Sequence, residues 1–266
     1  MIDLNQIAGQ VLDPYARQAR LAPALIVLLP AILLIMVWFP ASWTLWGVII
    51  SVACSCGLVL LLSQIARDRG KQREPELYAA WGGKPSVALL RHRDERINDN
   101  TKSRYLSFLK SKLPALIVPT PEEERANPKA ADSAYESVTA WLLTQTRDTK
   151  KFSLLFRENI SYGFRRNLWG LKALGLATAI LAASMSTAVI VYQYAFASKT
   201  PTPEIVIVTA LSWLLSIFWI VVVTPSWVKI PADAYGTQLL SACDTLNGSN
   251  GAKAVSEKRK RGRSAT

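Results

Sequence analysis

The sequence is poor in the side chains that catalysis and metal binding require. Its 266 residues include one histidine, His92, and three cysteines. A single histidine excludes a two-histidine metal site and leaves any Ser-His or Cys-His mechanism with one candidate. Cys54 and Cys56 lie inside an apolar run, and three cysteines cannot form a disulfide framework. We therefore expect no enzymatic activity, cofactor or metal, and the remaining enzymatic alternative is a membrane enzyme that uses His92 and Asp94.

Charged residues are absent from four long apolar stretches. These stretches are Leu21–Phe39, Ser42–Ile65, Leu174–Ala197 and Ile205–Thr224, and none contains Asp, Glu, Lys, Arg or His. Each has about the 20 residues that a helix needs to cross a bilayer core. Because lipid offers the backbone no hydrogen-bond partners, the stretches must be helical. The sequence predicts an all-α, polytopic membrane protein with four transmembrane helices. The first stretch is too long for the core of a secretory signal.

The distribution of charge predicts how the chain crosses the membrane. The connections within each pair of apolar stretches are short, and together they carry only Lys199 and Glu204. Residues 66–167 hold 20 basic and 13 acidic residues, part of a chain total of 31 Lys+Arg and 19 Asp+Glu. Basic segments beside membrane helices are retained in the cytoplasm. We expect a bacterial inner-membrane protein with both termini in the cytoplasm and a helical cytoplasmic domain inserted between transmembrane helices 2 and 3.

Five segments follow from this layout. They are an N-terminal amphipathic helix (1–20), a membrane hairpin (21–65), the basic helical domain (66–167), a second hairpin (168–224) and a C-terminal segment with a disordered basic tail (225–266). The first segment suits either the membrane surface or a packing site under the helical domain. The basic tail would contact lipid and fix the topology, with nucleic-acid contact as its alternative.

Start and stop signals divide the helical domain into elements. Proline at a first helical turn, side-chain caps and glycine after a helix are the signals used. They predict helices over Glu76–Trp81, from Pro85 to about Arg96, over Thr101–Leu113, from Asn127 to about Asp148, and from Lys151 into the third apolar stretch, with a solvated connection at Pro119–Glu124.

Basic residues alternate with aromatic residues in this domain. Arginine binds phosphate through two hydrogen bonds, and aromatic rings stack on bases, so the pattern suits an oligonucleotide. The candidate ligand-binding residues are Arg91, His92, Arg93, Lys102, Arg104 and Tyr105. A solvated surface, or contact with anionic lipid, explains the same charges.

Small and hydroxyl residues recur at helical spacing in the last two apolar stretches. Such stripes mark close helix packing, or they line a pore shared between several copies of the chain. The candidate pore-lining residues are Gly175, Ala179, Ala183, Thr187, Thr209, Ser212 and Ser216. We expect Arg157, Arg165 and Arg166, which precede the third stretch, to couple the helical domain to the membrane. The absence of charge inside the stretches argues against an ion-coupled pump.

Several local strings resemble a known family. They are Trp81-Gly82-Gly83, Arg91-His92-Arg93-Asp94, Arg104-Tyr105 and Tyr162-Gly163-Phe164-Arg165-Arg166-Asn167. Together with two membrane hairpins around a basic helical domain, they resemble the HalA-type membrane effectors of the Hailong antiphage defence system. The resemblance covers most of residues 67–224. It implies a homotetrameric ion channel, controlled by a single-stranded DNA oligomer that a partner nucleotidyltransferase makes.

Two functions remain open at this point. The first is a ligand-gated, oligomeric channel effector, which the resemblance favours. The second is a non-enzymatic membrane anchor or adaptor, whose helical domain recruits a partner protein while its basic surface contacts lipid. Both account for the missing catalytic motifs. The oligomeric state separates them, because a channel made of four-helix chains needs several copies around an axis.

Overall fold

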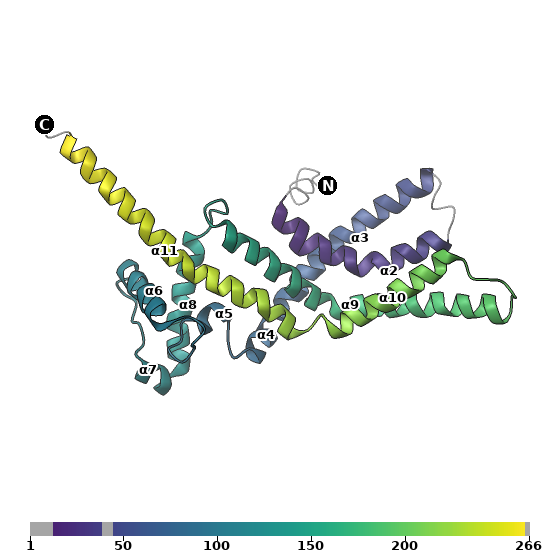
Figure 1. Ribbon diagram of the computed structural model, residues 1–266, viewed down its shortest axis with the longest axis horizontal. Helices are drawn as coiled ribbons and strands as arrows, with labels where there is room; N and C mark the ends of the chain where they lie inside the picture. Colours follow the sequence, from purple (N-terminus) through teal and green to yellow (C-terminus); the bar gives the residue numbers. More distant parts are fainter. Residues whose placement is uncertain (1–12, 39–44, 264–266) are drawn as a thin grey trace. The chain divides into compact units, whose positions relative to one another are not determined.

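The computed structural model describes the backbone of residues 13–38 and 45–263, and the side chains of residues 13–38 and 57–248. Within these ranges the chain is helical and contains no strand, which confirms the all-α prediction (Figure 1). Its elements are a π-helical turn, η1 (Ala16–Leu21), and the α-helices α2 (Ala22–Trp38), α3 (Leu45–Gln72), α4 (Glu74–Ala80), α5 (Pro85–Ala88), α6 (Asp99–Lys112), α7 (Pro121–Ala126), α8 (Pro128–Gln145), α9 (Ser153–Ala195), α10 (Pro203–Val221) and α11 (Pro225–Arg263).

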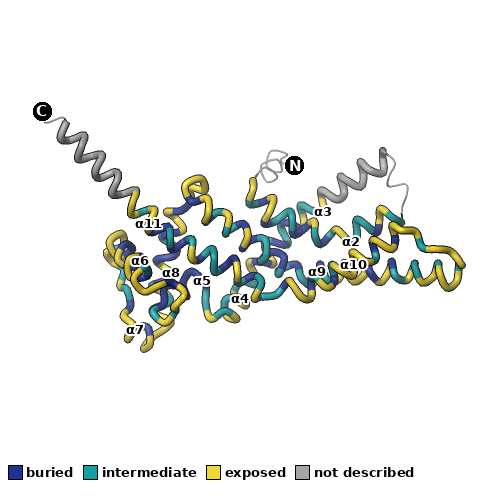
Figure 2. The backbone as a smooth tube through the Cα atoms, viewed as in Figure 1, coloured by how far each residue is buried: buried dark blue, intermediate teal, exposed yellow. Residues whose placement is uncertain are grey.

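Three helical segments are long and apolar enough to cross a membrane. They are Ala16–Trp38, which joins η1 to α2, and the helices α9 and α10. Along α9 and α10, buried residues alternate with exposed ones, and most of the exposed large side chains are apolar (Figure 2). Apolar side chains that face outward along most of a helix suit contact with lipid or with another protein surface. The fourth predicted span corresponds to α3, but residues 39–44 and the side chains of 45–56, including Cys54 and Cys56, lie outside the described residues.

The chain folds as two compact units. Unit 1 comprises Met1–Leu77 and Ile160–Lys229, and unit 2 comprises Tyr78–Asn159 and Ile230–Thr266. This division differs from the predicted domains, because the C-terminal segment does not stand alone. Leu239, Leu240 and Cys243 of α11 are almost fully buried in the same core as the residues of α6 and α8.

The core of unit 2 contains residues of α5, α6, α8 and α11. Leu109, Tyr135 and Leu142 are among its most deeply buried members, and Phe152 and Leu155 from the start of α9 belong to it. α8 has an apolar face toward this core, since Tyr135, Val138 and Leu142 are all buried. Asn98 caps α6 by accepting a hydrogen bond from the backbone N–H of Asn100.

The core of unit 1 is formed by α2, α3, α9 and α10. Val27, Leu62, Leu168 and Trp219 are buried there. α3 and α9 approach each other closely at two glycines, because a Cβ added to Gly170 would lie 2.5 Å from the backbone nitrogen of Gly70. Close backbone approach of this kind is typical of small residues at helix interfaces in membranes.

The N-terminal segment departs from the predicted division at residue 20. Residues 1–12 lie outside the described part, so most of the predicted amphipathic helix is not tested. The carboxylate of Asp13 accepts hydrogen bonds from the backbone N–H groups of Tyr15 and Ala16. Helical structure then continues from Pro14 through η1 into α2 without a break.

Three predictions about local structure are wrong. The helix from Pro85 is only four residues long and does not reach Arg96, because side chains bind the backbone of the following turns. Pro121–Ala126 is a helix instead of a solvated connection, with a capping box between Thr120 and Glu123. The tail after Asn247 was expected to be disordered, whereas α11 continues to Arg263. The predicted continuous helix from the domain into the third apolar stretch is confirmed as α9, 43 residues long.

Candidate functional site

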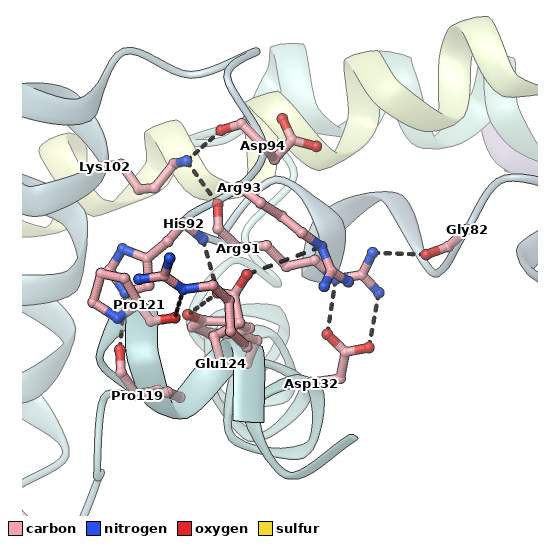
Figure 3. Close-up of polar contacts among 12 residues, drawn as sticks. Gly82, Arg91, His92, Arg93, Asp94, Lys102, Pro119, Pro121, Glu124 and Asp132 are labelled. Carbon is pink, nitrogen blue, oxygen red and sulfur yellow. Dashed lines mark hydrogen bonds and ion pairs between the residues drawn. The ribbon is translucent and has the colours of Figure 1, made fainter. Parts of the chain in front are cut away.

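Arg91, a predicted ligand contact, is held by groups of the chain itself. Its Nε and Nη2 donate to the two carboxylate oxygens of Asp132, both at 2.8 Å, and its Nη1 donates to the carbonyl of Gly82 at 2.7 Å (Figure 3). Gly82 and Gly83 have φ values of +76° and +134°, which L side chains rarely adopt. The two-glycine turn therefore lets the guanidinium lie directly against the backbone, and Arg91 locks α5 to α8.

Lys102 is also occupied within the fold. Its side chain is 3 % exposed, and its ammonium donates to the carbonyls of Arg91 (2.8 Å) and Asp94 (Figure 3). A buried ammonium requires such partners, and the Arg91 carbonyl also accepts a hydrogen bond from the Asp94 backbone N–H at 3.2 Å. Lys102 thus stabilises the irregular turns after α5.

Asp94 lies in the same turns with its carboxylate paired to Arg96. The Arg96 Nη2 lies 2.6 Å from the carboxylate. Burial alone would raise the pKa of Asp94, but hydrogen bonds from Arg96 and the charges of Arg96 and Lys102 outweigh it and lower the pKa. A lowered pKa means an ionised, acceptor-only carboxylate at neutral pH, and the Arg96 guanidinium donates to both of its oxygens.

Glu124 is a buried acidic residue of this region that the sequence analysis did not single out. Its side chain is 3 % exposed and accepts hydrogen bonds from the His92 backbone N–H at 2.8 Å and from the Tyr135 hydroxyl at 3.0 Å. Burial, followed by the hydrogen bond to Glu124, raises the pKa of Tyr135 well above its ordinary value. The capping-box signature of Thr120 and Glu123 was the available signal, since it predicts a helix that places Glu124 toward the core.

The remaining predicted ligand residues differ in their surroundings. The His92 Nε2–H donates to the Pro119 carbonyl at 2.8 Å. Arg93 is half exposed and lies 4.0 Å from Glu124. Arg104 forms a two-pronged ion pair with Asp244 of α11, with both N···O distances 2.9 Å, and Tyr105 is buried in the core. The six residues lie together in unit 2, but most of their polar groups already bind the protein.

A cavity of about 410 Å³ opens beside two of these residues. It is lined by His92, Asp99, Lys102, Ser103, Leu106, Ser107, Lys110 and Val118. No group of three or more histidine, cysteine or acidic side chains that suits a metal ion occurs in the described part of the chain.

One of the predicted coupling residues, Arg166, belongs to a polar junction in unit 1. Arg166 is 6 % exposed, and its Nη1 donates to the Glu74 carboxylate at 2.6 Å. The same carboxylate oxygen accepts a hydrogen bond from the Tyr162 hydroxyl at 3.0 Å. The fully buried Asn167 donates to the carbonyl of Ala19 at 2.6 Å. These contacts tie α9 to α4 and to η1.

The neighbouring basic residues tie α9 to the last two helices. Arg165 donates to the carbonyl of Trp227 at 2.9 Å and lies 4.7 Å from the centre of its ring. Lys172 donates to the carbonyl of Val223, beyond the end of α10, at 2.7 Å. Arg157, the third coupling candidate, is exposed and makes no ion pair within the described residues. α9 is therefore linked through side chains to α4, η1 and the α10–α11 connection.

The predicted pore-lining stripes face the interior of the chain. Ala179, Ala183 and Ser212 are fully buried and Ser216 is 2 % exposed, and a Cβ added to Gly175 would lie 2.2 Å from the Trp219 ring. The Thr209 hydroxyl donates to the Ile205 carbonyl, and the Thr187 hydroxyl accepts from the half-exposed Trp213. These faces pack α9 against neighbouring helices, as the packing interpretation of small-residue stripes expects.

Comparisons with known protein families, with curated proteins and with solved structures found no match to this chain.

Proposed function

We propose that the chain is a non-enzymatic, homo-oligomeric channel effector of a bacterial inner membrane, opened or closed by a polyanionic ligand that binds unit 2. In this proposal α3 supplies the fourth transmembrane helix and residues 78–159 lie in the cytoplasm with both termini. The resemblance noted from the sequence supports a homotetramer, a single-stranded DNA oligomer as the ligand and a nucleotidyltransferase as the partner that makes it.

The observation that carries the proposal is the continuity of α9. One helix of 43 residues begins in the core of unit 2 with Phe152 and Leu155 beside its first turn, and ends as an apolar span. A continuous helix transmits rotation or translation of one end to the other, because its backbone hydrogen bonds resist bending. Ligand binding to unit 2 would therefore move the span directly, with Arg165 and Arg166 as the contacts that change.

The pore needs a face of α9 that the chain does not cover itself. One side of this helix exposes four small residues, Ala173, Ala177, Ser184 and Ala188, with the larger Ile180 between them. Small residues let helices of neighbouring copies approach closely around an axis. We propose that this side of α9 lines the pore or contacts a neighbouring copy of the chain. The Gly175–Thr187 stripe is buried and does not take this role.

The ligand would bind basic groups that are exposed and form no ion pair among the described residues. Arg147, Lys150, Lys151 and Arg157 are exposed around the start of α9 and form no ion pair within the described part of the chain. Several phosphates bound by these residues would release counterions, so the affinity would fall steeply with salt. Their place at the start of α9 suits a ligand that acts on this helix.

Planar-bilayer recordings of the purified protein test the proposal. We expect conductance that changes when single-stranded DNA oligomers are added, and no ligand response in the Ser161→Pro variant. Ser161 is exposed within α9, so proline there breaks the helix between the two units without removing a core contact. Ser161→Ala is the control. No conductance with or without oligomers would contradict the channel.

A membrane adaptor is the second candidate, and one observation favours it. Arg91, Lys102 and Arg104, the strongest ligand contacts in the sequence, have their partners inside the protein. An adaptor needs only a stable helical unit on a membrane anchor. A monomer in detergent would favour the adaptor, and a symmetric ring would favour the channel.

A further inference from the structure

The cavity in unit 2 has one wall built from a single face of α6. Asp99, Ser103, Ser107 and Lys110 line it, and they follow one another at intervals of four, four and three residues. Residues at this spacing share one helix face, and the rise of 1.5 Å per residue places Ser103 and Lys110 about 10 Å apart along the axis. This cavity, called the groove below, therefore has a row of polar groups along one wall.

The polar groups in this row are available to a ligand. Ser103, Ser107 and Lys110 are exposed, and among the described residues neither hydroxyl makes a hydrogen bond within the protein and Lys110 makes no ion pair. This distinguishes them from Arg91 and Lys102, whose polar atoms are satisfied internally. Two free hydroxyls and an ammonium at one end of a groove form a binding site for an anionic group such as phosphate.

The rest of the lining is apolar or fixed in position. Leu106 and Val118 supply apolar surface, on which a flat ring can lie. His92 borders the groove with its Nε2–H committed to the Pro119 carbonyl, so its Nδ1 remains for a ligand donor. Lys102 also lines the cavity, but it is 3 % exposed and its ammonium is bound to two carbonyls, so it adds positive charge without a free donor. Asp99 can accept from hydroxyl or amino groups of a ligand.

We propose that this groove binds a nucleoside monophosphate or a molecule of the same size and chemistry. Its phosphate would contact Ser107 and Lys110, its ring would lie on Leu106 and Val118, and its sugar hydroxyls or amino group would donate to Asp99. The volume of about 410 Å³ suits one such molecule. The site is separate from the exposed basic residues at the start of α9, and it does not depend on channel activity.

Isothermal titration calorimetry of the full-length protein in detergent tests the site, with adenosine 5′-monophosphate as the probe. We expect saturable binding of the nucleotide to the unmodified protein. The Lys110→Ala variant should bind it at least tenfold more weakly, because the variant lacks the ammonium that contacts the phosphate. Adenosine should bind the unmodified protein with a similar loss of affinity, because it lacks the phosphate. Lys129→Ala is the matched control, since Lys129 is an exposed lysine on α8 outside the groove. It should bind like the unmodified protein.

Other outcomes would overturn the proposal. Equal binding to the Lys110→Ala and Lys129→Ala variants would place the nucleotide elsewhere. Inorganic phosphate that binds as tightly as the nucleotide would show a simple anion site without ring recognition. Absence of binding at millimolar probe would exclude the site altogether. Oligonucleotide binding or conductance that persists in Lys110→Ala leaves the channel proposal intact, so the two proposals fail separately.

Discussion

At the scale of a single residue, Arg91 connects three parts of unit 2. Its guanidinium binds Asp132 on α8 and the Gly82 carbonyl, while its own carbonyl accepts from Lys102 on α6. Removing one partner of a mostly buried ion pair leaves the other without compensation. The Arg91 side chain is 11 % exposed and that of Asp132 is 34 % exposed, so solvent screens part of this cost.

We expect Arg91→Ala to lower the free energy of unfolding by about 2 kcal/mol. Arg91→Lys should lose part of this amount, because an ammonium cannot reproduce the two parallel hydrogen bonds to Asp132. Arg93→Ala, at a half-exposed neighbour, should change stability by less than about 1 kcal/mol. Chemical denaturation in detergent measures all three, and equal losses for Arg91→Ala and Arg93→Ala would contradict a structural role for Arg91.

Cys243 gives the core of unit 2 a dependence on alkaline pH. Burial, with a smaller contribution from Asp244, raises the pKa of its thiol from 9.0 to about 12. Between these values the unfolded thiol ionises while the folded thiol keeps its proton, so stability contributed by the neutral thiol is lost as pH rises. We expect stability to fall between pH 9 and 12, and less steeply in Cys243→Ala. Parallel pH profiles of the two proteins would contradict this origin.

At the scale of elements, the crossing of α3 and α9 depends on two glycines. A Cβ on Gly170 would lie 2.5 Å from the Gly70 nitrogen and 2.9 Å from the Arg69 carbonyl carbon, and backbone atoms cannot move aside cheaply. Gly57, also in α3, has nothing within 4 Å of the position of an added Cβ. Alanine substitutions at Gly170 and Gly57 therefore distinguish the effect of helix packing on stability from the effect of helix propensity.

We expect Gly170→Ala to destabilise unit 1 by about 1–3 kcal/mol, because the helices must separate. Gly57→Ala should be neutral or stabilise by up to about 1 kcal/mol, since alanine favours the helix more than glycine does. Thermal unfolding in detergent, followed by loss of helical circular dichroism, measures the difference. A Gly170→Ala protein as stable as Gly57→Ala would show that this close approach does not contribute.

At the scale of the whole molecule, unit 2 is built from two separate stretches of chain. Its core needs Leu239, Leu240 and Cys243, which follow the last apolar span in the sequence. A chain that ends at Lys229 lacks all three, and the loss of several buried side chains exceeds the stability of an ordinary domain. A chain that ends at Asn247 keeps them.

We expect trypsin to cleave residues 78–159 in the chain that ends at Lys229. The full-length protein should remain intact over the same digestion time. The chain that ends at Asn247 should resist trypsin like the full-length protein, since Leu246 is the last described residue packed on the core. Limited proteolysis at matched detergent concentration measures this. Equal resistance of both truncated proteins would mean that residues 78–159 fold without α11.

Sequence patterns predicted most of the elements and missed how they are joined. Apolar length was sufficient for Ala16–Trp38, α9 and α10, and caps located α6 and α8. The sequence named Arg91 and Arg104 as ligand contacts but did not predict their ion pairs, because Asp132 and Asp244 lie 41 and 140 positions away from them. Contacts at such separations leave no local pattern.

The split origin of unit 2 has a consequence for biosynthesis. Residues 78–159 leave the ribosome long before Leu239 and Leu240, and α9 and α10 are translated in between. The core of unit 2 therefore stays incomplete until α10 and the first part of α11 have been translated. Synthesis that stops before Leu239 leaves residues 78–159 without the side chains that complete their core.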